Sequence, residues 1–146
     1  MCFFDLFKLE ENSVLLYDAF SKEGIGDSLL PIAEELKRSH PDIKIIASCK
    51  KMVDKKDLPF VDEIVLNKTL KMKYYAAKVK YIVSVLGWPF KNWKRKNQIF
   101  VQIWHGSPLK KLYLSKDKTN KRYIKYTSKY RFADIFCSQG EVHNKN

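Results

Sequence analysis

Short apolar runs alternate along this chain with charged segments and with stretches of helical spacing. Runs of this length, rich in β-branched and aromatic residues, are typical of buried strands. They predict strands at residues 13–17, 43–48, 61–66, 81–86, 99–104 and 133–138. Helical spacing predicts one helix from Leu29 to just before Pro41 and another at 70–79. This alternation predicts an α/β fold, a Rossmann-like parallel sheet flanked by helices.

Capping residues mark where the predicted helices begin. Asp27 or Ser28 can cap the first helix and Thr69 the second. The loop before the first helix contains Gly24 and Gly26 as a lone G-x-G, which is a weak phosphate-loop signal. Because this loop follows a strand and precedes a helix, we expect it at the carboxyl edge of the sheet.

The 146 residues are enough for one domain that buries its own core. The formal net charge of +12 indicates a polyanionic partner or an anionic surface. Nucleic acid, anionic lipid and a polyphosphate polymer fit that charge equally, so charge alone does not choose among them.

Cysteine and histidine spacing indicates neither disulfides nor a metal site. Cys2, Cys49 and Cys137 are odd in number, widely spaced and form no CxxC pair, which predicts reduced thiols in the cytoplasm. The histidines lack metal-ligand spacing, and we expect no metal and no cofactor. The first nine residues do not have the pattern of a secretory signal peptide, and the longest uncharged run, 81–90, is too short to span a bilayer.

The candidate chemistry is concentrated in residues 98–111. The strand at 99–104 is followed by His105, and Gly106 then permits a tight turn. Ser107 is a good N-cap, and Pro108 suits the first helical position. The expected order is strand, histidine, turn and helix start, which places His105 where open α/β sheets bind ligands.

Two lysines fall in the first turn of this predicted helix, where the macrodipole favours acidic residues. Places that break a local rule are often functional sites. Lys110 and Lys111, together with His105 and backbone N–H groups near Ser107, indicate a phosphate pocket. The alternative is a helix whose lysines point to solvent, with His105 as a hydrogen-bonded turn residue.

Residues 104–112, Trp-His-Gly-Ser-Pro-Leu-Lys-Lys-Leu, resemble the WHGT-P-L-K-K-L-G signature of the CDP-glycerol glycerophosphotransferase family. This family comprises teichoic-acid polymerases and primases of Gram-positive cell walls. Gln98 and Gln102 also fit the family's strand. Two positions depart from the signature: Ser107 stands where threonine is usual, and Tyr113 stands where glycine is usual.

The resemblance implies a fold and a reaction. The fold is the N-terminal domain of a GT-B glycosyltransferase-type fold, as an acceptor-side domain at 13–139 with a tail at 140–146, and without the C-terminal donor-binding domain. The reaction transfers an alditol phosphate from CDP-glycerol or CDP-ribitol to a hydroxyl acceptor in teichoic-acid biosynthesis, with release of CMP. His105 would be the general base. Phosphate or acceptor contacts would come from Gly106, Ser107, Lys110, Lys111, Gly26 and Asp27.

The implied partners are a CDP-alditol donor, a polyanionic or lipid-linked acceptor and an anionic membrane surface. The protein would be cytoplasmic and peripheral to the inner face of the plasma membrane. A second chain would supply the donor domain; alternatively, the sequence is a truncated gene product or a fragment. In either case we expect weak or absent turnover by the chain alone.

A function of another class remains open, namely a non-catalytic basic module for anionic membrane or nucleic acid, or an inactive remnant. Residues 87–97, which mix aromatic and basic side chains, support a binding module. That interpretation leaves His105 and its flanking motif unexplained, and nucleic acid is the less favoured partner.

Three other segments allow two interpretations or extend the resemblance. The aromatic-rich residues 1–12 are either an interfacial anchor or, as we favour, an arm packed on the domain. Residues 112–129 predict a basic amphipathic helix that either holds a polyanion or simply faces solvent. Residues 133–138 resemble the family's W-D-x-x-x-S segment through Asp134 and Ser138.

Overall fold

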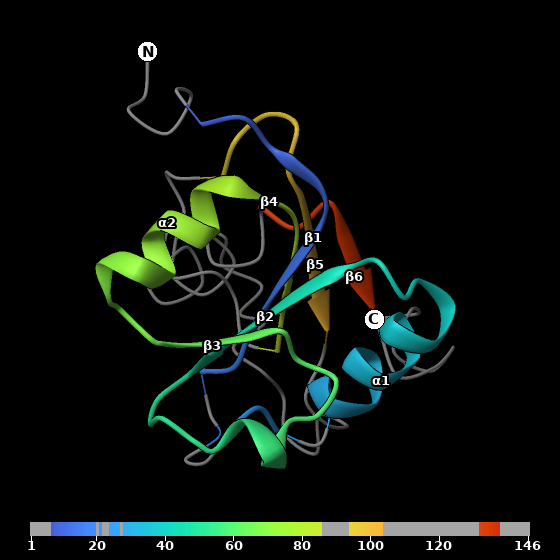
Figure 1. Cartoon of the computed structure of the whole chain (residues 1–146). Coiled ribbons are helices and arrows are strands. Elements are labelled where there is room, and N and C mark those ends of the chain that lie inside the picture. Colours follow the sequence, from blue (N-terminus) through green and yellow to red (C-terminus); the bar gives the residue numbers. More distant parts are fainter. Residues whose placement is uncertain are drawn as a thin grey trace, which may run out of the picture.

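Six parallel strands form the centre of the computed structural model, which describes residues 7–19, 21, 24–26, 28–85, 94–103 and 132–137. The strands are β1 (Glu10–Tyr17), β2 (Lys44–Cys49), β3 (Glu63–Leu66), β4 (Val79–Ser84), β5 (Ile99–Ile103) and β6 (Ile135–Cys137). Their order in the sheet is β3-β2-β1-β4-β5-β6 (Figure 1). Because the order reverses between β1 and β4, this is a doubly wound sheet. The predicted α/β fold class is confirmed.

The two described α-helices cover opposite faces of this sheet (Figure 1). Helix α1 (Leu29–Ser39) packs on one face, and α2 (Leu70–Lys78) packs on the other. A short 3-10 helix, η2 (Lys55–Asp57), lies in the connection from β2 to β3. Successive β1 residues point to opposite faces, as strand geometry requires, so Val14 joins the core under α1 and Leu15 the core under α2.

The predicted helix caps have different outcomes. Thr69 caps α2, because its hydroxyl accepts a hydrogen bond from the Met72 N–H at 3.2 Å, and this prediction is confirmed. Ser28 occupies the N-cap position of α1, but its side chain makes no capping hydrogen bond. Its backbone is already in the right-handed helical region, so the hydroxyl lacks the extended geometry of a normal cap. Asp27 lies outside the described residues.

The boundary between α2 and β4 differs from the sequence prediction, which extended the helix through Val79 and began the strand at Tyr81. In the structure β4 starts at Val79, directly after the helix. Two buried carbonyls of this junction are satisfied by the buried Gln98 amide, which donates to Ala76 O at 2.7 Å and Val79 O at 2.8 Å. Arg95 donates to Ala77 O at 3.0 Å. These tertiary partners allow the helix to end without a loop.

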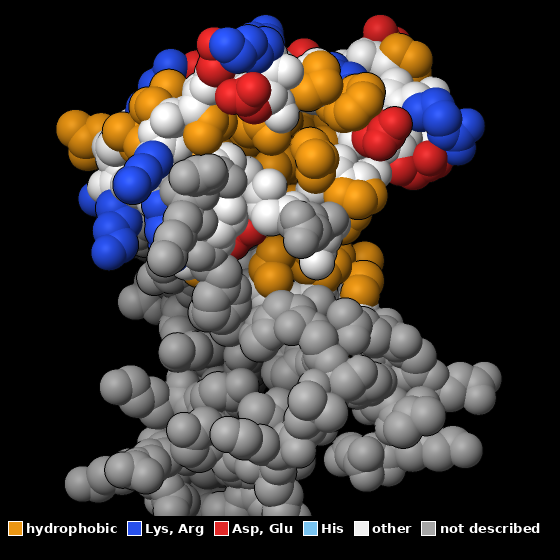
Figure 2. Space-filling model, turned by 90° about the horizontal axis from the view of Figure 1, so that it is seen from below, with side chains coloured by type: hydrophobic (Ala, Val, Ile, Leu, Met, Phe, Trp, Pro, Cys, Tyr) orange, Lys and Arg blue, Asp and Glu red, His pale blue; other side chains and the backbone are white. Residues whose placement is uncertain are grey.

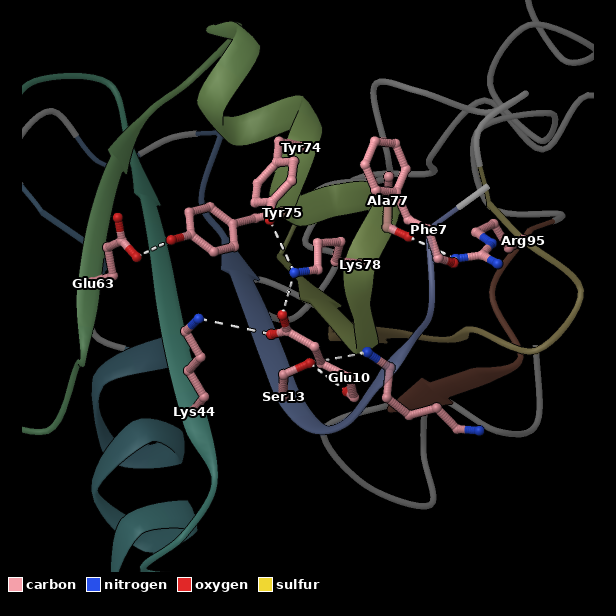
Figure 3. A network of polar contacts seen from close by, with 11 residues as sticks. Phe7, Glu10, Ser13, Lys44, Glu63, Tyr74, Tyr75, Ala77, Lys78 and Arg95 are labelled. Atoms are coloured by element: carbon pink, nitrogen blue, oxygen red, sulfur yellow. Dashed lines mark hydrogen bonds and ion pairs between the residues drawn. The ribbon is translucent and has the colours of Figure 1, made fainter. Parts of the chain in front are cut away.

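Strand β1 begins three residues before the predicted start at Ser13, within the segment assigned to the arm. Its first residue, Glu10, lies between two lysines (Figure 3). The Glu10 carboxylate is 2.5 Å from Lys78 Nζ and 3.7 Å from Lys44 Nζ. Just before the strand, the Phe7 ring packs edge-on against Tyr74 of α2, and Phe7 O accepts a hydrogen bond from Arg95. These contacts extend the ordered strand toward the N-terminus.

Both edge strands are attached to the sheet by the same arrangement. Asp62, just before β3, donates its N–H to Ile45 O at 2.9 Å and accepts the Ile45 N–H at 2.7 Å. Asp134, just before β6, makes the same pair of bonds with Phe100, at 2.9 and 2.6 Å. Each carboxylate also pairs with a lysine that approaches from another element. An aspartate clamp therefore fixes each edge strand against its inner neighbour.

Replacing Gln98 by alanine is expected to lower the free energy of unfolding by about 2–4 kcal/mol, because buried carbonyls at the α2–β4 junction lose their donor. Urea denaturation followed by circular dichroism measures the change. Asn97→Ala alters the exposed neighbouring residue and serves as the matched control. Equal stability of the two variants would contradict the capping role of Gln98.

Stability is expected to fall as the pH drops below about 4, the usual pKa of aspartate. Burial raises the pKa of Asp134, but hydrogen bonds from Lys94 and the Phe100 N–H outweigh it and leave that pKa below its ordinary value. The pKa of Asp62 is lowered in the same way by Lys37 and the Ile45 N–H. A lowered folded-state pKa stabilises the fold above the unfolded-state pKa, and this contribution is lost as the pH falls through the folded value.

The double variant Asp62→Asn and Asp134→Asn is therefore expected to be less stable at pH 7 and to lose less stability between pH 5 and 2 than the parent chain. Urea denaturation at a series of pH values gives both quantities. A parent and a variant with parallel pH profiles would show that these carboxylates do not carry the acid sensitivity.

Candidate functional site

The carboxyl edge of the sheet is where the sequence placed the candidate site. Strand β5 runs parallel between β4 and β6 and ends at Ile103, which confirms the predicted strand up to that residue. Of the predicted site residues, Gly26 is described. The other predicted positions, and Trp104 before them, lie outside the described residues: His105, Gly106, Ser107, Lys110, Lys111 and Asp27. Their roles stay predictions.

Gly26 lies in the loop between β1 and α1, against the side chain of Asp18. Its N–H donates to Asp18 Oδ2 at 2.7 Å, and its carbonyl accepts the N–H groups of Leu29 and Leu30 at the start of α1. A Cβ at this position would lie 2.8 Å from Asp18 Oδ2, closer than normal contact allows. Glycine therefore permits a carboxylate of the chain itself to approach this closely.

Asp18, which the sequence interpretation passed over as a loop residue, is a buried charged residue of this edge. It is 3% exposed and follows β1 at the point where the strand order reverses. Its Oδ1 accepts the Ser21 N–H at 2.9 Å, while Oδ2 accepts that of Gly26. An acidic residue directly after an apolar strand and before a G-x-G was the available signal, because such a carboxylate can close a turn.

The charge of Asp18 affects two neighbouring side chains. Burial and, secondarily, the Asp18 carboxylate raise the pKa of the Cys49 thiol to about 11. The same two causes, in the same order, raise the pKa of Tyr17 above its ordinary value. Cys49 is buried at the end of β2 and is a protonated thiol at neutral pH. A buried carboxylate therefore lies at the carboxyl ends of β1 and β2.

Side chains from β2 and the β3 end hold the Asp18 main chain in place. Asn67 Nδ2 donates to Asp18 O at 3.1 Å, and the Ser48 hydroxyl donates to Asn67 Oδ1. The Asn67 N–H donates to Cys49 O at 2.8 Å. The ends of three neighbouring strands are thus joined in one hydrogen-bonded cluster around Asp18.

Residues 87–97 are the basic segment that suggested a nucleic-acid or membrane module. Two of its described cations make contacts within the fold. Lys94 pairs with Asp134 at 2.7 Å and has a side chain that is 16% exposed. Arg95 donates to the carbonyls of Phe7 and Ala77 (Figure 3). Within the described part of this segment, Lys96 is the exposed cation. Two of the three charges of Lys94–Lys96 therefore serve the fold.

The described surface contains hollows on both sides of α1. One, of about 460 Å³, is at the carboxyl edge, between the start of α1 and the segment after β2, and is lined by Gly24, Ile25, Leu30, Lys51, Met52, Val53, Asp57 and Leu58. The other, of about 380 Å³, lies between α1 and the sheet, and its lining is largely apolar. Seen from below, the described surface has hydrophobic side chains gathered between charged ones (Figure 2).

The described residues contain no group of three or more histidine, cysteine, aspartate or glutamate side chains that could hold a metal ion. Within the same residues, no helix is both long and apolar enough to cross a membrane.

Comparison with known proteins gives a consistent set of relatives. The family model described as CDP-Glycerol:Poly(glycerophosphate) glycerophosphotransferase matches residues 1–145. The teichoic acid poly(glycerol phosphate) polymerases of Staphylococcus epidermidis and Bacillus subtilis are 32% and 23% identical over 114 residues. Each match spans 75% of this chain and 15% of the relative, so the chain corresponds to a small part of those polymerases.

Solved structures of the wall teichoic acid polymerase TagF share the fold. TagF itself superposes with a TM-score of 0.72 at 17% identity, over 94% of this chain and 35% of TagF. A histidine-to-asparagine variant of TagF soaked with CDPG gives a TM-score of 0.73 at 17% identity over the same shares. This likeness confirms the predicted GT-B-type Rossmann-like fold.

The sequence match over almost the whole length and the shared fold lead to one conclusion: this chain belongs to the CDP-Glycerol:Poly(glycerophosphate) glycerophosphotransferase family.

Proposed function

We propose that this chain is the acceptor-side domain of a glycerophosphotransferase of teichoic-acid biosynthesis. The observation that carries the proposal is the family match over residues 1–145, which includes the motif at 104–112. The motif follows β5, whose parallel placement directs its end toward the ligand-binding edge of a doubly wound sheet. Support for a CDP-alditol donor comes from the related TagF structure soaked with CDPG.

In the proposed reaction, an acceptor hydroxyl attacks the β-phosphate of CDP-glycerol or CDP-ribitol. The new bond joins the acceptor oxygen to that phosphorus, the bond from phosphorus to the bridging oxygen breaks, and CMP leaves with the electron pair. His105 takes the hydroxyl proton, since an imidazole accepts protons near neutral pH. Lys110 and Lys111, with backbone N–H groups near Ser107, offset the phosphate charge.

The proposed partners are a polyanionic or lipid-linked acceptor, the anionic inner face of the plasma membrane and a chain or segment that holds the donor. The net charge of +12 supports anionic partners of this kind. The alternative of a basic module without chemistry loses support, because Lys94 and Arg95 bind within the fold. We place the protein in the cytoplasm as a peripheral membrane protein.

Binding of a short glycerol phosphate oligomer tests the phosphate contacts. The double variant Lys110→Ala and Lys111→Ala is expected to bind at least about tenfold more weakly, because two charge-assisted contacts are lost. Lys55→Ala with Lys56→Ala removes the same charge from the exposed η2 and is the matched control. Isothermal titration calorimetry at fixed salt gives the affinities. An equal loss in both double variants would indicate non-specific attraction to a basic surface.

Transfer from radiolabelled CDP-glycerol to the same oligomer, measured in the presence of the chain or segment that holds the donor, tests the role of His105. His105→Ala is expected to lower the transfer rate by roughly 10²–10⁴-fold, the usual contribution of a general base, with little change in oligomer affinity. His40→Ala changes an exposed histidine at the end of α1 and is the control. Transfer at the parental rate in His105→Ala would exclude His105 as the base.

A further inference from the structure

We infer that Asp18 closes the β1–α1 junction to phosphate groups and is a specificity-determining residue of the proposed reaction. In doubly wound sheets, this first strand-to-helix junction commonly binds the pyrophosphate of a nucleotide through the N–H groups of its loop and helix. Here a carboxylate of the chain itself accepts two of the described loop donors, the N–H groups of Ser21 and Gly26. The inference rests on the proposed function, because a diphosphate donor must take part in the reaction for its exclusion from this junction to matter.

The loop donors are the first part of the evidence. Asp18 presents one oxygen to the Ser21 N–H at 2.9 Å and the other to the Gly26 N–H at 2.7 Å. A phosphate that used either of these N–H groups would have to displace the carboxylate. Charge-assisted hydrogen bonds of this length are strong. The carboxylate belongs to the same chain, so it loses no translational freedom on binding, whereas a separate phosphate would.

The start of α1 is the second part. An α-helix normally leaves its first N–H groups without partners, which creates an anion site. The N–H groups of Leu29 and Leu30 instead donate to Gly26 O at 2.9 and 3.2 Å. Pro31, the next residue, has no N–H. The first three residues of α1 therefore have no N–H left for a phosphate.

The local charge is the third part. Asp18 is 3% exposed, and Asn67, supported by Ser48, fixes its carbonyl. Burial and, secondarily, the Asp18 carboxylate raise the pKa of Cys49 and of Tyr17, so both side chains are favoured in their neutral forms. A second anion placed beside these N–H groups would meet the Asp18 carboxylate, which already occupies them. On this inference Gly26 shapes the loop around Asp18, and the motif at 104–112, after β5, makes the phosphate contacts.

Chemical rescue by an anion tests this role. The test uses the full chain carrying Lys110→Ala and Lys111→Ala, so that the proposed phosphate contacts do not mask the result. Adding Asp18→Ala to it is expected to lower the melting temperature, and millimolar inorganic pyrophosphate is expected to restore about 3 °C or more by binding the vacated N–H groups. With Asp18 intact, pyrophosphate should leave the melting temperature unchanged.

Asp62→Ala in the same background is the matched control. It also removes a carboxylate that accepts a backbone N–H at 2.7 Å, but at the start of β3. It should be destabilised without rescue by pyrophosphate. Rescue of both variants, or of neither, would overturn the inference.

A second measurement does not depend on the Asp18 variant being folded. In the chain with Asp18 intact and both lysines replaced, the amide NMR signals of Ser21 and Gly26 should not shift when pyrophosphate is added. A saturable shift of these signals would overturn the inference. The proposed function is judged separately, by the loss of glycerol phosphate binding when Lys110 and Lys111 are replaced while Asp18 is unchanged.

Discussion

Hydrogen bonds from backbone N–H groups to aspartate side chains hold the ends of this parallel sheet. Strand ends leave main-chain donors outside the regular ladder, and a donor without a partner is costly inside a protein. Asp62 and Asp134 bind such donors where the edge strands begin, and Asp18 binds them where the central strand β1 ends. The same chemistry attaches the edges and shapes the loop at the reversal of strand order.

The two edge clamps share a short sequence feature. Phe60-Val61-Asp62 and Phe132-Ala133-Asp134 each place a phenylalanine two residues before the clamping aspartate. Phe60 packs on the core under α1, and Phe132 packs on the core under α2. The aspartate thus binds the edge strand to its neighbour, while the phenylalanine ring holds the segment before that strand against one face of the sheet. This gives the Asp134 of the family-like segment a structural role.

Net charge is a poor guide to the binding surface of this protein. Lys37, Lys78, Lys80 and Lys94 pair with carboxylates, and Arg95 binds carbonyls inside the fold. At the carboxyl edge, the end of β1 carries the buried carboxylate of Asp18, whereas the lysines of the family motif follow β5 in the sequence. Such a separation suits a domain that binds phosphate after β5 and excludes it from the β1–α1 junction.

The sequence by itself determined most of each described strand and α-helix, the parallel α/β class and the family, because hydrophobic period, capping residues and a contiguous motif are local signals. It also placed the motif after a buried strand, which the structure shows as far as Ile103. Only the tertiary structure decided that α2 gives way to β4 without a loop, and that Asp18 rather than a ligand takes the Gly26 N–H. Those outcomes depend on partners distant in sequence, such as Gln98 for the α2 carbonyls and Asn67 for the Asp18 main chain. Local propensity carries no information about such partners, so only folding brings them together.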